Sequence, residues 1–434
     1  MPAETRFPLC GECRLEEITF HGWPAVRLSN GLVTAVAVPE LGGRVMSLTL
    51  GPYEYLFMNQ ALAGKQFTPE EHFGDGSLTA WKNYGGDKTW PAPQGWERGD
   101  QWPGPPDPIL DSGPYQAQTF TDGRSVGLAM VSPPDLKHTG LRIHRRLTLK
   151  PQAARLQLQL MFENVVDRPI RWSIWEVAQM DCARPAGPNT DCWVYIPTAP
   201  EVTAERPYQI LYGDENPQWR AQIVPGLMGV HYLGYVGKIG VASPAGWMAF
   251  ANESAGYVLC ACFAYEAGAE YPDGGASVEV WTESPSAPSP VPIRSPGYLL
   301  EVEVLGPLHS LQPGERTSLG LEWGLARCPG PVVQANAAGC VHVPLTVTRD
   351  REWAWVQGVF GCFEVGEVEL AWLDRGGHIL EQRVLQAASP QSVLWLDTVT
   401  PLPSEAIRGR LQLRRLDGSL SGPLAEGVIR HDRA

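Results

Sequence analysis

Residues 141–162 read LRIHRRLTLKPQAARLQLQLMF, and this stretch decides the fold class. Within 141–150 and within 155–162, apolar residues alternate with polar ones. A period of two is typical of strands that bury one face and expose the other. The Pro-Gln-Ala-Ala segment between them supplies a turn. The stretch therefore predicts an antiparallel hairpin on a half-solvated sheet.

Short strand-like segments continue on both sides of this hairpin. They occur between residues 15 and 58, at 125–132 and at 169–180, and residues 182–230 are rich in loops. Six more follow, at 238–242, 247–251, 258–265, 277–283, 298–305 and 317–325. We find no helical pattern longer than two turns and no repeat of 20–50 residues. Strands at short intervals, separated by Gly/Pro turns, predict an all-β sandwich.

A loop-like seam near residues 326–338 separates these strands from a second set. About a hundred residues follow it, and they again alternate between strand-like segments and turns such as Arg-Gly-Gly at 375–377. This size and texture are those of a small immunoglobulin-like β-sandwich. We therefore predict two domains, residues 1–328 and residues 336–434.

Composition narrows the classes of function. The chain has 434 residues and a formal net charge of −13, which disfavours nucleic acid as a partner because such binding depends on Lys and Arg neutralising phosphates. No apolar run is long enough for a membrane-spanning helix, so we expect no membrane partner. The nine scattered cysteines and the lack of an apolar leader predict a cytoplasmic protein. No motif for a nucleotide, a cofactor or a metal is present, so we expect none of these.

Residues 81–108 read WKNYGGDKTWPAPQGWERGDQWPGPPDP and contain four tryptophans, six prolines and five glycines. So many prolines and glycines predict a long, irregular, internally packed loop. Flat indole faces beside charged groups suit a hydroxyl-rich ligand with apolar C–H faces, which is a sugar. The same tryptophans could instead only plug one end of a β-sandwich, and the sequence leaves both interpretations open.

Four segments, in this order, resemble the galactose-mutarotase-like superfamily, which has the fold of aldose 1-epimerases. They are NGLVTAVAVPELGGRVMSL (30–48), NYGGDKTW (83–90), ENVVDRPIRWSIWEV (163–177) and YLLEVEVLGPLHSLQPGE (298–315). The resemblance covers about the first 325 residues. It implies a large galactose-mutarotase-like β-supersandwich whose concave sheet binds a mono- or oligosaccharide.

The resemblance also implies catalytic residues. In true mutarotases, a glutamate on the late strand is the base for the anomeric hydroxyl, and a histidine protonates the ring oxygen. Glu301 matches that glutamate, and Glu303 shares its strand face. Trp175 stands where the family has its histidine, so the general acid is unassigned. His72 could substitute for it or could be an exposed loop residue.

The remaining candidates are ligand contacts. Lys88 and Trp90 belong to the Gly-Gly segment, and Gln179 shares the polar face of its strand with Trp175. Arg44 could reach the cleft or could satisfy carbonyls at the preceding glycine bend. Lys238, on an apolar strand, is either a substrate contact or part of a structural salt bridge.

Two hypotheses of function follow, and they differ in whether the protein is an enzyme. One is aldose epimerisation or a related sugar isomerisation, with Glu301 as the base. The other is non-catalytic sugar binding or sensing in the same cleft, with Trp90 and Trp175 as stacking platforms. A polysaccharide lyase or hydrolase on the same fold is a third possibility, which the absence of a secretion signal weakens.

Overall fold

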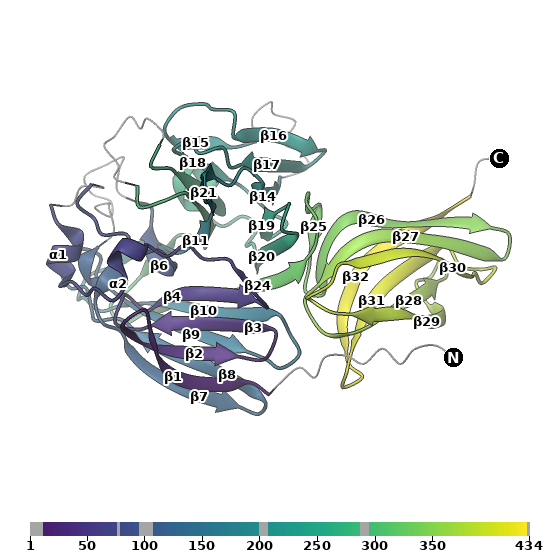
Figure 1. The fold of residues 1–434 in the computed structure, drawn as a ribbon, viewed down its shortest axis with the longest axis horizontal. Helices are drawn as coiled ribbons and strands as arrows, with labels where there is room; N and C mark the ends of the chain where they lie inside the picture. Colours follow the sequence, from purple (N-terminus) through teal and green to yellow (C-terminus); the bar gives the residue numbers. More distant parts are fainter. Residues whose placement is uncertain (1–11, 76–78, 95–106, 199–206, 287–294, 432–434) are drawn as a thin grey trace.

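The computed structural model describes residues 12–75, 79–94, 107–198, 207–286 and 295–431. The described part is built from β-strands packed in three large sheets, so the all-β prediction is confirmed (Figure 1). Helices are limited to short turns: η1 (Gln60–Leu62), α1 (Pro69–Phe73), α2 (Pro108–Ser112) and α3 (Pro272–Gly275). None of the helices among these residues is long and apolar enough to cross a membrane.

The first sheet has twelve strands and carries the candidate site. Its main path, in spatial order, is β1 (Arg14–Phe20), β2 (Trp23–Ser29), β3 (Val33–Val38), β4 (Arg44–Leu50), β6 (Asp87–Ala92), β11 (Ile170–Asp181), β22 (Leu299–Leu305), β21 (Val278–Glu283), β18 (Gly237–Val241) and β15 (Gln209–Tyr212). The short strands β5 (Tyr53–Glu54) and β23 (His309–Leu311) pair with β4 and β11. Strands distant in sequence therefore become neighbours at the centre of this sheet.

The second sheet has ten strands and contains the hairpin predicted from residues 141–162. Its order is β16 (Trp219–Val224), β17 (Leu227–His231), β14 (Cys192–Pro197), β19 (Trp247–Asn252), β20 (Tyr257–Phe263), β24 (Arg316–Arg327), β10 (Arg155–Asn164), β9 (Leu141–Leu149), β8 (Ser125–Val131) and β7 (Gln116–Asp122). β9 and β10 pair antiparallel, with Leu149 opposite Leu156. The hairpin prediction is confirmed.

The two sheets pack face to face around one core. Apolar residues of the hairpin, such as Leu147 and Leu158, belong to the same buried cluster as Ile174 and Met180 of β11 and Val302 of β22. Because side chains alternate along a strand, the neighbours of these residues on β11 and β22 point away from the core. That outward face of the first sheet holds the candidate site.

A third sheet of eight strands forms the other end of the molecule (Figure 1). It contains β25 (Gln334–Ala335), β26 (Gly339–Asp350), β27 (Trp353–Cys362), β28 (Gly366–Leu373), β29 (Ile379–Ala388), β30 (Leu394–Pro401), β31 (Arg408–Arg415) and β32 (Leu420–His431). A core of its own includes Val356, Leu370 and Trp372. A separate cluster containing Ala326, Cys340 and Phe363 joins it to the second sheet. The domain boundaries at 328 and 336 stay predictions.

The segment 81–108 is more regular than the sequence predicted. Residues 95–106 lie outside the described residues, so the loop interpretation of that part has no outcome here. The preceding residues form the fully buried strand β6, which contains Pro91. β6 pairs with β11 along its whole length but with β4 only at Asp87. A strand partnered on one side is where a sheet tolerates proline, because no second ladder of hydrogen bonds is lost.

Candidate functional site

Five adjacent strands present polar and aromatic side chains on the outward face of the first sheet. The register aligns them in rows: Trp90 of β6 lies opposite Trp175 of β11, and Gln179 of β11 lies opposite Glu301 of β22. Glu301 in turn lies opposite Trp281 of β21, which faces Lys238 of β18. The rows explain why residues far apart in sequence meet here.

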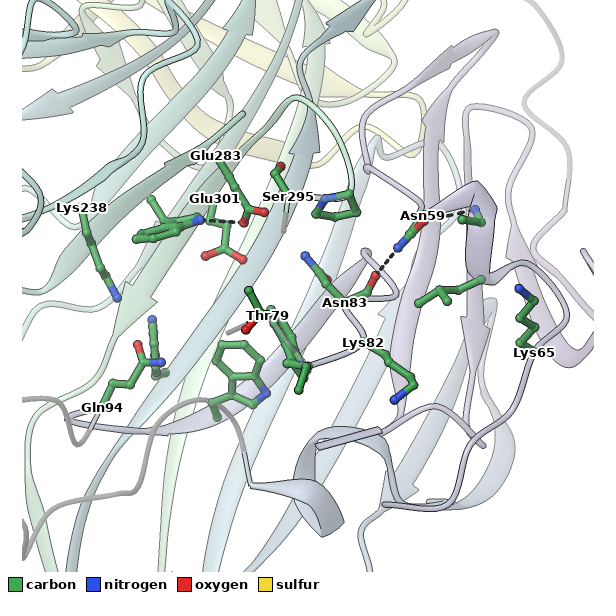
Figure 2. A pocket seen from close by; sticks show the side chains of 18 residues that line it. Asn59, Lys65, Thr79, Lys82, Asn83, Gln94, Lys238, Glu283, Ser295 and Glu301 are labelled. Carbon is green, nitrogen blue, oxygen red and sulfur yellow. Dashed lines mark hydrogen bonds between the residues drawn. The ribbon is translucent and has the colours of Figure 1, made fainter. Parts of the chain in front are cut away.

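These rows form the floor of a cavity of about 550 Å³, within the range of ligand-binding pockets. Trp90, Trp175, Lys238 and Glu301 line it, as do other residues that the sequence analysis did not single out (Figure 2). They include Asn83, Trp281 and Glu283, and Trp81 of the predicted tryptophan-rich segment lines the cavity as well. The predicted tryptophans and the late-strand carboxylate therefore border one shared cavity.

Glu301 is held by two donors from neighbouring strands. The Lys88 ammonium lies 2.9 Å from its Oε1 atom, and Gln179 Nε2 donates to the same oxygen at 2.6 Å. Among the described residues, Oε2 receives no hydrogen bond. Burial lowers the pKa of Lys88, while the charge of Glu301 opposes that shift. Lys88 and Gln179 thus meet Glu301 from behind the cavity surface and leave one carboxylate oxygen available.

Glu283 is a second carboxyl group in the lining, and the sequence analysis did not select it. Trp281 Nε1 donates to its Oε2 atom at 3.1 Å, and the side chain is 5% exposed. Burial raises its pKa to about 7, hydrogen bonds from Trp281 and Ser295 oppose that rise, and the negative charge of Glu301 adds to it. A sequence signal was present, because period two places Glu283 on the same face of its strand as Trp281.

Lys238 stands at the other end of the row and is fully engaged. Its ammonium lies 2.6 Å from Glu279 and 3.1 Å from Glu303, which are both buried carboxylates. Burial alone would lower the pKa of Lys238, but the two negative charges raise it. The structural salt bridge expected as one alternative is therefore present, although Lys238 also lines the cavity.

Glu303 does not reach the cavity, which corrects its expected place among the ligand contacts. It is completely buried, and Trp175 Nε1 donates to its Oε2 atom at 2.7 Å. The Lys238 ammonium covers the Trp175 ring at 4.1 Å from the ring centroid. Glu303 therefore fixes Trp175 and Lys238 from behind, because both the indole and the ammonium lie between it and the cavity.

The indoles on the β6 side converge on one buried carboxylate, Asp111 of α2. Trp90 Nε1 and Trp81 Nε1 each donate to it at 2.9 Å. Arg44 lies 2.5 Å from the same carboxylate. Burial would raise the pKa of Asp111, but Arg44 and His72 hold it below its usual value. Asp111 thus orients two indoles of the cavity wall, a role with no local sequence signal.

Arg44 and His72 are outside the cavity lining. Arg44 is fully buried and donates to the Gly85 carbonyl at 3.0 Å, besides its ion pair with Asp111. Of the two alternatives predicted for Arg44, the structure shows the one in which its side chain satisfies a carbonyl. The predicted ligand contact is corrected, because the side chain lies outside the cavity lining. His72 is also buried, bound to Asp111 and stacked on Tyr84, so it is neither an exposed loop residue nor a cavity residue.

Asn83 contributes a buried amide donor to the lining. Its side chain is 5% exposed, and its Oδ1 atom accepts from the backbone amide of Gly85 at 3.0 Å. Among the described residues, its Nδ2 atom has no hydrogen-bond partner. Figure 2 shows Asn83 at the end of the cavity where Glu283 and Glu301 lie. A buried donor without a partner costs free energy, so a group aimed at a cavity in this way indicates a ligand.

The chemistry of the lining is that of a polar organic ligand. Carboxyl groups, ammonium groups and amides lie beside indoles, so hydrogen bonds and apolar contacts are offered together. Within the described ranges, no group of three or more His, Cys, Asp or Glu residues is arranged to hold a metal ion.

Residues 24–326 match the model of a family described as Domain of unknown function (DUF4380), and the chain belongs to this family. No curated protein matches the sequence.

Solved structures with a similar fold include galactose mutarotase-like proteins. The one from Clostridium acetobutylicum is 10% identical, with 73% of this chain and 99% of that chain covered and a TM-score of 0.45. The one from Lactobacillus casei is 12% identical, with coverages of 69% and 99% and a TM-score of 0.44. A TPR-domain containing protein from Parabacteroides distasonis is 14% identical, with a TM-score of 0.49; 72% of this chain matches about half (49%) of that one.

Proposed function

We propose that the cavity binds a saccharide and interconverts its anomers, with Glu301 as the base. The observation that carries this proposal is the meeting of three kinds of group in one cavity. Glu301 offers a carboxylate oxygen, Asn83 offers an amide donor that has no partner within the described residues, and Trp81 and Trp281 offer indole surface. Hydroxyl groups need both acceptors and donors, and the C–H faces of a sugar ring pack on indoles.

Other ligand classes fit this lining less well. A purely apolar ligand would leave Glu283, Glu301 and Asn83 desolvated and unpaired, which is costly. An anion held at the inner end would face two carboxyl groups at short range, and like charges repel. A neutral, hydroxyl-rich molecule meets neither penalty, and the sequence resemblance described above implies the same class of ligand.

The indoles contribute unequally to such a ligand. One face of Trp90 is covered by the Lys88 ammonium at 4.5 Å from the ring centroid, and Trp175 is covered by Lys238. These cation–π contacts occupy the surfaces that were expected to stack on a sugar. Trp81 is only half-buried, and Trp281 lines the wall near Glu283, so both add indole surface to the lining.

The environment of Glu301 suits a general base. Lys88 and Gln179 both bind Oε1, which fixes the carboxylate plane and keeps Oε2 available for the anomeric hydroxyl. A positioned base of this kind contributes roughly 10²–10⁴-fold to the rate of a proton-transfer step. Glu301 takes the hydroxyl proton as the ring C–O bond breaks, and it returns the proton when the ring closes.

Polarimetry tests this proposal directly. Freshly dissolved α-D-glucose and α-D-galactose are followed with wild type, Glu301→Gln and Glu17→Gln, whose carboxyl group is exposed on β1. We expect wild type and Glu17→Gln to accelerate the change in rotation, and Glu301→Gln to lose about 10²–10⁴-fold of that acceleration. Equal acceleration by Glu301→Gln would contradict the role of Glu301.

Non-catalytic saccharide binding is the second candidate. Two observations favour it: Trp175 cannot transfer a proton as a histidine does, and Lys88 neutralises Glu301 through a contact of 2.9 Å. In that case none of the variants accelerates mutarotation, while the sugars still raise the melting temperature of wild type in a saturable way. The same polarimetric and thermal experiments therefore separate the two functions.

A further inference from the structure

We infer that Glu283 is the general acid of the proposed reaction, the group that protonates the ring oxygen while Glu301 takes the anomeric proton. This assignment rests on the proposed function and adds the catalytic residue that the sequence left open. It gives the cavity two carboxyl groups with opposite tasks.

The positions of Glu283 and Glu301 on adjacent strands suit a shared reaction. β21 and β22 are adjacent, with Trp281 opposite Glu301 and Glu283 opposite Leu299. Glu283 and Glu301 are therefore diagonal neighbours on the same sheet face, a relation that separates residues by about 7–8 Å. Both line the cavity, and Figure 2 shows their carboxyl groups at the same end of it. A sugar ring placed over this pair can meet one carboxyl group at its anomeric hydroxyl and the other at its ring oxygen.

The second argument is the difference between their surroundings. Glu301 touches the Lys88 ammonium and the Gln179 amide, two donors from neighbouring strands. Glu283 has neutral partners in the Trp281 indole and the Ser295 hydroxyl, and Glu301 adds a negative charge nearby. Burial and that charge raise the pKa of Glu283 to about 7, so it keeps its proton at lower pH. Two carboxyl groups with such different partners can divide the work of an acid and a base.

The charged groups around Glu283 come from several strands. Glu301 on β22 favours the protonated form of Glu283, and Lys88 on β6 opposes it. Lys238 on β18 lines the same cavity but is paired with Glu279 and Glu303. His72, the histidine considered from the sequence, is bound to Asp111 outside the lining. Of the two lining carboxyl groups, Glu301 is paired with a cation, and Glu283 has no ion pair with any residue that the structure describes.

The step balances without an added reactant. Glu301 removes the proton from the hydroxyl group on C1, and the C1–O5 bond breaks with its electron pair moving to O5. Glu283 gives its proton to O5, which leaves an open-chain aldehyde with a C5 hydroxyl group. Rotation about the C1–C2 bond presents the other face of the aldehyde. Reversal of both proton transfers then closes the ring to the other anomer and restores both carboxyl groups.

The test compares wild type, Glu283→Gln and Glu283→Asp by polarimetry across pH, with α-D-galactose and α-D-glucose. We expect the kcat of wild type to fall as pH rises through about 7, because Glu283 loses its proton there. Glu283→Gln should lose about 10²–10⁴-fold in kcat, with KM changed much less and without the alkaline fall in rate. Glu283→Asp, which keeps a transferable proton, should recover part of the rate and retain an alkaline fall.

The outcomes separate the assignment from the proposed function. A wild type without acceleration removes the proposed function, and this assignment with it, before any variant is made. An active wild type whose Glu283→Gln variant keeps most of its kcat and the same pH profile overturns the assignment alone. Circular dichroism and thermal stabilisation by the sugar establish that the variant is folded and binds. As an independent readout, difference infrared spectra of wild type should show a protonated carboxyl signal that is absent from Glu283→Gln.

Discussion

Strand β11 carries a polar cluster on each of its faces, and the two clusters differ in what they border. On the core face, Glu176 lies 3.1 Å from Arg145, which also pairs with Asp87. On the cavity face, Gln179 binds Glu301, which pairs with Lys88. All of these side chains are buried, but Glu301 lines a ligand-sized cavity whereas the core-face cluster lies between two packed sheets.

The comparison teaches that a shifted pKa or an unpaired buried atom is not by itself a sign of function. Burial raises the pKa of Glu176 well above its usual value, and nearby Asp87 raises it further. Among the described residues, Arg145 Nε and Asp87 Oδ2 lack hydrogen-bond partners, just as Asn83 Nδ2 does. Perturbed groups occur in structural ion-pair networks as well as in active sites. Access to the cavity is what distinguishes the two faces.

The largest expected effect is on the core face. Arg145→Met removes the cation that Asp87 and Glu176 share, and leaves two carboxyl groups in a core without a counter-charge. Loss of one partner from a buried ion pair costs about 3–5 kcal/mol, so we expect the free energy of unfolding to fall by about 4 kcal/mol. Urea unfolding followed by tryptophan fluorescence measures this change.

The next residue on the same strand is a matched control. Arg146 is exposed, and its guanidinium lies 3.6 Å from the centroid of the Phe120 ring. An exposed cation–π contact is worth about 0.5–1 kcal/mol, so Arg146→Met should change stability by no more than that. Equal losses in the two variants would show that the core-face cluster is not held together by its cation.

Period two was enough to predict much of this arrangement. It correctly separated the two faces of β11, because strand alternation needs no tertiary information, whereas Glu301 became a candidate through the family resemblance. It also puts Arg145 in line with Ile143 and Leu147, a sign of a buried charge that the sequence analysis passed over. The hairpin β9–β10 followed from the same rule.

The remaining features depend on contacts between distant segments. Asp111 receives donors from Arg44, His72, Trp81 and Trp90, which lie 67, 39, 30 and 21 residues away. No local pattern marks an aspartate in a five-residue helix as their common acceptor. The division between Glu283 and Glu301 likewise depends on Lys88, which a different strand supplies.

A second prediction concerns Asp111, which is buried like the core-face cluster but binds two indoles of the cavity wall. Asp111→Asn removes the counter-charge of Arg44 and places an amide N–H₂ against groups that are themselves donors. The Gly85 carbonyl still accepts from Arg44, so we expect a loss of about 3 kcal/mol, at the lower end for a broken buried pair. Saccharide affinity should also fall, because Trp81 and Trp90 lose a shared acceptor.

The pH dependence of stability gives this variant a specific signature. The pKa of Asp111 is held below its usual value, so its contribution is complete above the unfolded pKa of about 4 and is lost as pH falls toward the folded pKa. Asp111→Asn should therefore flatten the acid side of the stability curve. Asp107→Asn is the control for the helix, because Asp107 caps it and asparagine caps equally well; burial raises the pKa of Asp107 to about 7, so this variant should change the acid side in the opposite direction. An unchanged acid limb in Asp111→Asn would contradict the role of Asp111.

The smallest expected effect contrasts two asparagines, one on each side of the comparison. Asn83→Asp keeps the Oδ1 acceptor for Gly85 but replaces the free donor. One hydrogen bond to a ligand is worth about 0.5–1.5 kcal/mol, so saccharide affinity should fall up to roughly tenfold, and the new carboxyl group near Glu283 and Glu301 should also cost some stability. Isothermal titration and urea unfolding measure the two quantities.

Asn30 is the opposite case, because its Nδ2 atom is fully used. It donates to the carbonyls of Lys150 and Ala153, both at 2.7 Å, while its Oδ1 accepts from Leu32 and Val33. Asn30→Asp should therefore cost stability and leave affinity unchanged, whereas Asn83→Asp lowers affinity. If both variants lost stability and neither lost saccharide affinity, the donor of Asn83 would have a structural role like that of Asn30. Asn83 would then not contact the ligand, and access to the cavity would not distinguish it from a buried structural asparagine.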